Sequence, residues 1–346
     1  MKSVFFYSLA ACGLVFLVLL YPWVPGSSSI AIQPFSEYSA TSTAKINMLV
    51  EEDSSLDALV VADSNRMTLA LGEVTEPINT HSIRKSIMSI LIGLSAAEGK
   101  LNVDQSLAEL GLDDALSPLT DAEKQATVAD LMASRSGIYI SAAGEHDDQI
   151  TKRPARGSHR PGEVYFHNNW DFNALDSVLE AVGDATETRF LELADKLGFE
   201  DYRSGHFYYQ ETPASAHKQY TIFLSARDLA KVGQLVLRHG RTQSGEQLVS
   251  AGWIELITRA QAKIQHYLYT DAALMWWIDQ KSNLIWADGW GGHFMLIDME
   301  NDLVIVARNH TGRRLGGLLW RSVLGHVEQG TQMNLMQVRE YLLADR

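Results

Sequence analysis

The stretch that decides the fold is residues 82–99, SIRKSIMSILIGLSAAEG, in which two polar groups precede a long apolar run. From residue 86 onward the run is mostly apolar, with small residues interspersed, and it contains no proline. A surface helix keeps one polar face, whereas this run has too few polar residues to form one. It therefore predicts a helix buried between layers. Gly99 is a typical residue for ending such a helix.

Ser82 and Lys85 fall at the start of this predicted helix, one turn apart on the same face. A serine hydroxyl keeps its proton at neutral pH, but an amine one turn away can accept that proton when burial lowers the amine's pKa. The helix dipole and the unpaired backbone N–H groups favour negative charge beside Ser82. The pair predicts a nucleophile with its base. The alternative is that Ser82 is only a helix N-cap and Lys85 is solvated.

The N-terminus carries a nearly unbroken apolar run over residues 4–20, which follows the single cationic residue Lys2. The run is just long enough to span a bilayer, and Lys2 favours a cytoplasmic start. We expect residues 1–25 to be a signal anchor. The alternative is a signal peptide removed near residues 29–31. Cys12, the only cysteine, lies inside this run, so we expect no disulfide in the exported part.

The rest of the 346-residue chain reads as soluble and globular, with a formal net charge of −13. That charge argues against nucleic acid or an anionic membrane surface as a partner, so the N-terminal helix is the only membrane contact we expect. The histidines show no metal-ligand spacing, and we predict neither a metal nor a cofactor. The sequence leaves the oligomeric state open.

The globular part combines strands at both ends with helices between them. Two short apolar runs, residues 58–62 and 67–71, flank turn residues and predict a hairpin. From residue 82 to about 240 the pattern favours helix and loop. Strands are then expected at four places and a closing helix after them: residues 273–279, 283–286, 294–298 and 303–308, and the helix over 315–327. This order predicts an α+β fold whose antiparallel sheet uses both termini.

Three further stretches stand in a suggestive order behind residues 82–85. They are residues 133–138 (ASRSGI), 160–170 (RPGEVYFHNNW) and 288–294 (DGWGGHF). Together the four stretches resemble the serine β-lactamase and penicillin-binding-protein superfamily, most closely its class C-like branch of serine hydrolases, which includes esterases and D-Ala-D-Ala carboxypeptidases. The resemblance covers roughly residues 51–309. It implies one β-lactamase-related serine hydrolase domain over residues 46–346, after a linker at 26–45. That domain would have a β-lactamase/transpeptidase-like fold with an inserted, mainly helical subdomain.

The resemblance assigns roles to the residues that match its motifs. Ser82 would be the acylated nucleophile and Lys85 its proton acceptor. The family's Tyr-x-Asn element maps onto residues 167–169, so Asn169 would hold the substrate and steady Lys85. His167 then stands where the family has tyrosine. Since histidine titrates near neutrality, it can still shuttle a proton. Tyr165, two residues earlier, is an alternative substitute if the loop is shifted.

The third element of the family is usually Lys-Thr-Gly, and here it maps onto Trp290, Gly291 and Gly292. The glycines would let a substrate strand approach the backbone closely. The backbone N–H of His293 would pair with that of Ser82 as an oxyanion hole. Two structural alternatives remain open. Trp290 could pack on the sheet without contacting the substrate, and His167 could be a core histidine.

The missing cationic residue at Trp290 shifts the expectation toward neutral esters or amides. Three arginines in the loop before His167 could restore positive charge at the cleft, although a solvated or salt-bridged loop is the simpler interpretation: Arg153, Arg156 and Arg160.

The sequence hypothesis is a serine hydrolase of the bacterial cell envelope that cleaves a small-molecule or peptide ester or amide through a Ser82 acyl-enzyme. It would be membrane-anchored and face the periplasm or exterior, or be secreted if the N-terminal segment is cleaved. One alternative is a peptidoglycan-directed carboxypeptidase or β-lactamase. Another is a catalytically degenerate protein that binds an envelope ligand without turning it over.

Overall fold

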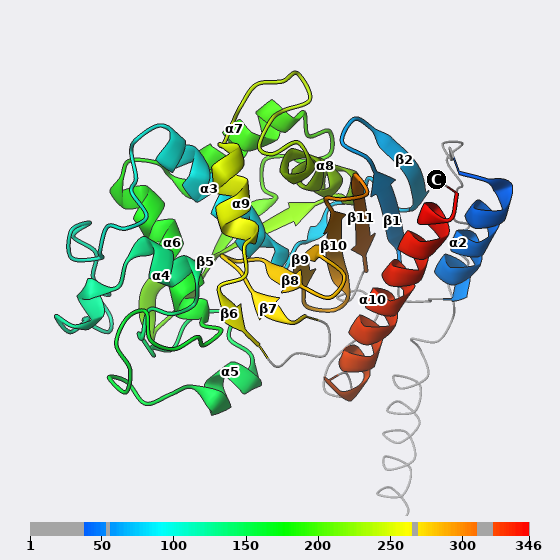
Figure 1. Ribbon diagram of the computed structural model, residues 1–346. Helices are drawn as coiled ribbons and strands as arrows, with labels where there is room; N and C mark the ends of the chain where they lie inside the picture. Colours follow the sequence, from blue (N-terminus) through cyan, green and yellow to red (C-terminus); the bar gives the residue numbers. More distant parts are fainter. Residues whose placement is uncertain (1–37, 53–55, 265–268, 310–320, 346) are drawn as a thin grey trace, which may run out of the picture.

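The computed structural model describes residues 38–52, 56–264, 269–309 and 321–345. Its main element is an antiparallel sheet with the strand order β2-β1-β11-β10-β9-β8-β7-β6 (Figure 1). The first and last strands along the chain are neighbours in this sheet, as the sequence predicted. The strands are β1 (Ala58–Ala62), β2 (Met67–Gly72), β6 (Ala262–Lys263), β7 (Asp271–Ala272), β8 (Trp277–Asp279), β9 (Leu284–Gly289), β10 (His293–Asp298) and β11 (Leu303–Arg308).

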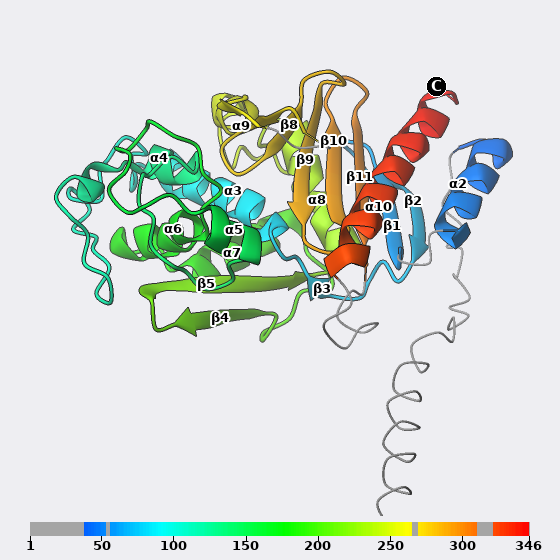
Figure 2. The same ribbon diagram turned by 90° about the horizontal axis from the view of Figure 1, so that it is seen from below.

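Both faces of the sheet are covered, which explains why its central strands read as continuous apolar runs rather than alternating ones. Val60 of β1 pairs with Ala70 and Val306 and faces helix α8 (Ala226–Leu237). Its neighbour Leu59 faces the opposite side, where α2 (Ala40–Glu52) and α10 (Arg321–Leu343) pack together. Figure 2 shows these two terminal helices side by side along the sheet.

The inserted region lies beside the sheet and carries the remaining helices. They are α3 (Ile83–Ala97), α4 (Val128–Met132), α5 (Asp147–Lys152), α6 (Asn169–Ala181), α7 (Thr186–Leu197) and α9 (Ala251–Thr258). It also contains a second sheet of three strands in the order β3-β5-β4, which the sequence did not predict. These strands are β3 (Ile78–Asn79), β4 (Phe207–Thr212) and β5 (Ser215–Leu224). Most of β4 is exposed, so its polar pattern resembles a loop.

Helix α3 is buried over nearly its whole circumference, as predicted from its composition. Small residues allow its neighbours to approach: the indole of Trp253 lies against Gly93, where an added Cβ would come within 2.3 Å of the ring nitrogen. That indole donates a hydrogen bond to the Ser89 carbonyl over 3.0 Å. Gly99, with a φ of +71°, follows the last turn and ends the helix.

Three sequence expectations need correction. Of residues 273–279, expected to be one strand, only 277–279 are strand (β8); residues 273–276 form the turn that joins β7 to β8, in which Met275 adopts a left-handed φ of +68°. The closing helix runs from residue 321 to 343, well beyond the predicted end at 327. Helix α2 begins at Ala40, inside the expected linker, because its apolar side packs on α10.

The predicted anchor at residues 1–25 lies outside the described residues. Within the described ranges, no helix has both the length and the apolar character needed to cross a membrane.

Candidate active site

Ser82 stands at the junction of β3 and α3, where the chain turns sharply. Thr80 fixes the approach, since both its N–H and its hydroxyl donate to the Ile222 carbonyl, over 2.9 and 2.8 Å. His81 then adopts a φ of +47°, and its N–H donates to Asn79 Oδ1 over 2.8 Å. A left-handed non-glycine residue beside a candidate nucleophile is typical of a functional site. Ser82 itself is half-buried and lines a pocket.

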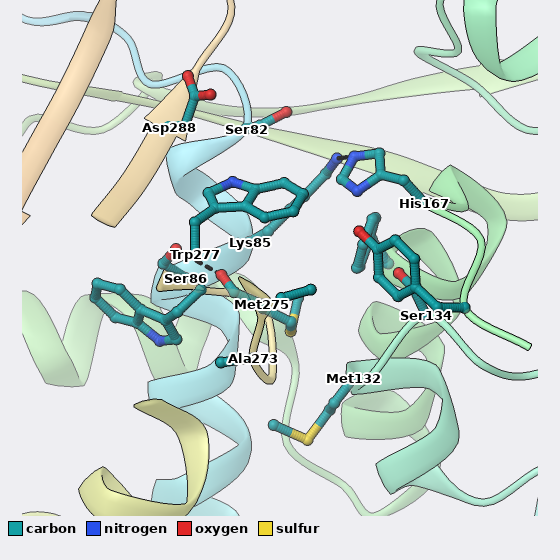
Figure 3. Close-up of a pocket in the computed structure, with 14 residues that line it drawn as sticks. Ser82, Lys85, Ser86, Met132, Ser134, His167, Ala273, Met275, Trp277 and Asp288 are labelled. Atoms are coloured by element: carbon teal, nitrogen blue, oxygen red, sulfur yellow. Dashed lines mark hydrogen bonds between the residues drawn. The ribbon is translucent and has the colours of Figure 1, made fainter. Parts of the chain in front are cut away.

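Lys85 lies one turn further along α3, and it is only 5% exposed. Its Nζ donates to Asn169 Oδ1 over 3.0 Å and lies 3.1 Å from His167 Nε2 (Figure 3). It also lies 4.3 Å from the centre of the Phe172 ring. Burial lowers the pKa of Lys85 well below its usual range, and the nearby Arg84 charge lowers it further, against a smaller upward effect of Asp288. This setting favours the neutral amine, which is the form that can accept a proton.

Asn169 is held in one orientation by its own contacts. It is the first residue of α6, and its Nδ2 donates to the Gly144 carbonyl. Its Oδ1 therefore faces the other way, where it accepts hydrogen bonds from Lys85 and, over 3.3 Å, from Gln149 Nε2. A fixed acceptor of this kind positions the amine of Lys85 without adding a charge that would hold the amine protonated.

His167 is clamped between two aromatic rings. Its imidazole stacks on Trp277, with centroids 5.5 Å apart and an interplanar angle of 26°, and it lies 5.0 Å from the Phe172 centroid. Its carbonyl accepts a hydrogen bond from Gln149 Nε2 over 3.0 Å. The ring is half-buried, and its Nε2 faces Lys85, so a single proton can bridge the two nitrogens.

The pocket brings together residues from widely separated parts of the chain. Ser82, Lys85, Tyr165, His167 and Asp288 line it, with a larger apolar set described below. Asn169 does not line the pocket but supports Lys85 from behind it. Burial raises the pKa of Tyr165, which keeps its phenol neutral. Among the lining residues that the structure describes, Lys85 is the only lysine or arginine.

The arginines of the preceding loop do not line this pocket. Arg153 pairs with Glu145, and Arg156 pairs with Glu123 over 2.8 Å. Arg160 is exposed. The expectation that these arginines restore positive charge at the cleft is therefore wrong for the described pocket, and the salt-bridged interpretation holds for two of them.

Trp290, Gly291 and Gly292, mapped onto the family's third element, form the turn between β9 and β10, and His293 directly after them begins β10. Trp290 is 40% exposed, and Gly291 and Gly292 have φ values of +92° and +85°. A Cβ on Gly292 would come within 2.3 Å of Asn309 Nδ2, so only glycine fits there. His293 is fully buried and accepts a hydrogen bond from Arg308 Nε over 3.1 Å.

This turn lies beside the nucleophile rather than in the pocket. The rings of Trp290 and His293 are 5.6 and 5.0 Å from that of His81, the residue before Ser82, and Trp290 also stacks on His146 at 6.3 Å. None of the four lines the described pocket. In the part of the chain that the structure describes, the Ser82 N–H bonds to no acceptor, which leaves it available to an oxyanion.

Sequence reasoning missed several residues that shape the site. Trp277 was interpreted as part of a half-buried strand, and Phe172 and Gln149 drew no attention. The sequence around Asp288 did indicate a special site, since Asp288 directly precedes Gly289, and Gly291 and Gly292 follow after Trp290. In the described ranges, no group of three histidine, cysteine, aspartate or glutamate side chains could hold a metal ion.

Comparison with known proteins agrees with this architecture. A penicillin-binding protein homologue from Pyrococcus abyssi is 18% identical, with a TM-score of 0.57 over 79% of this chain and 73% of its own. A β-lactamase from Mycobacterium bovis is also 18% identical, with a TM-score of 0.57 over 86% of this chain and 99% of its own. A penicillin-binding protein homologue from Caulobacter crescentus is 14% identical, with a TM-score of 0.59 over 80% of this chain and 93% of its own.

At these identities the structures share the fold, which is that of β-lactamase-like serine hydrolases. A search of curated proteins gave no significant match. The family model described as Beta-lactamase matches residues 57–314, which is most of the chain and includes every residue of the candidate site. The chain therefore belongs to the Beta-lactamase family.

Proposed function

We propose that this protein is a serine hydrolase that cleaves an ester or amide through an acyl-enzyme on Ser82, with Lys85 as the base. One observation carries the proposal. A buried lysine with a strongly lowered pKa lies one helical turn from Ser82, in the same pocket, and its hydrogen-bonding partners His167 and Asn169 are not carboxylates. Such an amine is suited to take the serine proton.

In the proposed reaction the Ser82 hydroxyl proton passes to Lys85 Nζ as Oγ attacks the substrate carbonyl. The negative oxygen that forms would accept a hydrogen bond from the backbone N–H of Ser82, at the N-terminal end of α3. When the tetrahedral intermediate collapses, the leaving alcohol or amine takes the proton back from Lys85. A water molecule then attacks the acyl-enzyme while Lys85 accepts its proton. As the second tetrahedral intermediate collapses, this proton passes from Lys85 to Ser82 Oγ, so the acid is released and both residues are restored.

His167 replaces the family's tyrosine as the second proton carrier in this proposal. Its Nε2 lies 3.1 Å from Lys85 Nζ, which is within hydrogen-bond distance. The imidazole can therefore pass a proton between Lys85 and the leaving group or the water. The stack on Trp277 holds the ring in the orientation that this transfer needs.

The charge of the pocket favours neutral substrates over those that carry a carboxylate. Asp288 is the only carboxylate among the described lining residues, and no cation other than Lys85 lines the pocket. Since burial favours the neutral form of Lys85, that residue would offset little of the repulsion between Asp288 and a substrate carboxylate. This observation supports an ester or neutral amide ahead of a peptidoglycan stem peptide or β-lactam.

The apolar run at residues 4–20 supports a cellular location as part of the same proposal. We infer that the enzyme acts in the bacterial cell envelope, anchored by that segment and facing the periplasm or exterior, or is secreted if the segment is cleaved.

The test is covalent labelling of the detergent-solubilised full chain with a fluorophosphonate, read out by intact mass and peptide mapping. We expect one adduct, located on Ser82 and abolished in Ser82→Ala. Ser86→Ala is the matched control, because Ser86 lines the same pocket but donates its hydroxyl to the Met275 carbonyl over 2.7 Å. The Ser86→Ala variant should still be labelled on Ser82.

A parallel incubation with penicillin separates the alternatives. Labelling by the fluorophosphonate alone fits the proposed esterase or amidase. A stable penicillin adduct on Ser82 would instead favour the peptidoglycan-directed alternative. Folded protein that reacts with neither reagent would overturn the hydrolase mechanism and leave the ligand-binding alternative.

A further inference from the structure

Part of the pocket wall is apolar, and of its members the mechanism above uses only Trp277, which stacks on His167. Its side chains come from three separate segments of the chain, and all but Trp277 are buried: Met132, Phe172, Ala273, Met275, Trp276 and Trp277. Figure 3 shows Ser82 and Met132 at opposite ends of this group of side chains. A polar substrate segment would lose its hydrogen bonds to water against such a wall, whereas a hydrocarbon segment would gain from burial.

The end of the pocket at Met132 leads into the protein core. Met132 is 1% exposed and Ala273 is 4% exposed, and both pack within the core cluster around α3 and α6. Near Ser82, at the other end, Trp290 is 40% exposed, and its ring lies 5.6 Å from that of His81, the residue before Ser82. A leaving group must depart before water can enter, while the acyl group stays attached to Ser82. A closed apolar end therefore suits the acyl group, and the exposed side suits the leaving group.

The pocket is small. Its volume is about 30 Å³, whereas a cavity that holds benzene measures about 150 Å³. A chain of a few carbon atoms fits such a space, but a long or branched acyl chain or an aromatic ring does not without displacing a wall.

We propose that the pocket selects a short, unbranched apolar acyl group, and that Met132 sets the longest chain it accepts. The proposal rests on the hydrolase function proposed above and names its substrate class. Ala273 contributes the second limit, because any side chain larger than its methyl group would project into the same small volume.

The experiment measures kcat/KM of the full chain on p-nitrophenyl esters of acetic, butyric, hexanoic and octanoic acid. We expect the acetyl and butyryl esters to be preferred. Met132→Ala removes Cγ, Sδ and Cε, so longer chains can then be buried. Each added methylene is worth roughly fourfold in transfer from water, and the hexanoyl-to-acetyl ratio should rise about tenfold. Ala273→Val should lower the butyryl-to-acetyl ratio instead.

Met295→Ala is the matched control, because Met295 is equally buried but packs between β10 and α8, away from the pocket. It should lower thermal stability without changing the chain-length ratios. A second series keeps the acetyl group and lengthens the alcohol. If Met132→Ala changes that series and not the acyl series, the pocket holds the leaving group and the proposal is overturned.

Labelling distinguishes the two proposals. If the fluorophosphonate modifies Ser82 in all three variants but the acyl-chain ratios match those of the unaltered protein, the acyl-pocket proposal fails and the hydrolase remains. If the unaltered protein is not labelled, the hydrolase function itself fails.

Discussion

Two lysines at opposite ends of α3 show how the surroundings decide what an amine can do. Lys85, in the first turn, is buried and bonds to Asn169 beside His167. Lys100, just past the last turn, is 44% exposed and forms ion pairs with Asp184 and Glu98 over 2.8 and 2.9 Å. The pKa of Lys85 is lowered well below its usual range by burial, whereas the hydrogen bonds that Lys100 donates to the two carboxylates raise the pKa of Lys100.

The difference lies in the partners and in burial, not in the residue type. Arg189 completes the network at Lys100, since it pairs with the same two carboxylates. Ionised partners there hold both cations in their charged forms. At Lys85 the partners can accept or donate hydrogen bonds but bring no negative charge into contact with the amine. The same helix therefore carries a proton acceptor at one end and a permanent cation at the other.

The largest expected effect comes from removing each amine in turn. Lys85→Met should lower kcat/KM by about 10²- to 10⁴-fold, the usual contribution of a general base. Lys100→Met should leave kcat/KM unchanged and lower Tm slightly, because exposed ion pairs contribute little to stability. Ester hydrolysis and thermal unfolding of both variants check this. Equal losses of activity in the two variants would show that Lys85 acts only through the fold.

A second prediction makes Lys85 resemble Lys100 by changing one atom of its partner. Asn169→Asp places a carboxylate against Nζ and should raise the pKa of Lys85, so that the protonated form dominates at neutral pH. Activity at pH 7 should fall about tenfold or more and recover at alkaline pH. Asn169→Leu is the control, since it removes the hydrogen bond without adding charge.

The pH–rate profile distinguishes these two variants. Asn169→Leu should lose activity at every pH, and the acid limb of its pH–rate profile should not move to higher pH. If Asn169→Asp shows the same unshifted profile, the amine of Lys85 is not the group whose ionisation controls the rate.

The smallest expected effect concerns the two charges near Lys85. The base must be neutral to act, so activity rises as pH increases through the pKa of Lys85. Arg84 lowers that pKa and Asp288 raises it. Arg84→Met should therefore move the acid limb to higher pH, and Asp288→Asn should move it to lower pH. Shifts in the same direction, measured on an uncharged ester, would contradict this electrostatic account.

Much of the fold could be predicted because it depends on local patterns. Continuous apolar runs identified β1, β2, β10 and β11, and the composition of residues 82–99 identified α3. The split between β7 and β8 could not be predicted, since methionine is not a residue that indicates a left-handed turn, yet Met275 adopts one. Strand β4 was missed because Tyr208 and Tyr209 lie exposed in it instead of alternating with buried residues.

The candidate site could be predicted only where one short motif carries the chemistry. Ser82 and Lys85 are one helical turn apart, so their proximity follows from the sequence. The stack of His167 on Trp277 joins the loop before α6 to β8 of the main sheet, and no local pattern indicates it. The same holds for the apolar wall of the pocket, whose members look like ordinary core residues until the fold brings them beside Ser82.

The pairing of β1 with β11 also affects when the chain can fold during its synthesis. Val60 acquires its partner Val306 only when nearly all of the protein has left the ribosome. Helix α3, which packs on β9 and β10, is made early but waits for strands made late. Such distant pairing slows folding and postpones it to the end of synthesis. A product truncated before β11 would thus hold Ser82 on an unsupported helix, so we expect unfinished chains to lack the hydrolase activity proposed for Ser82.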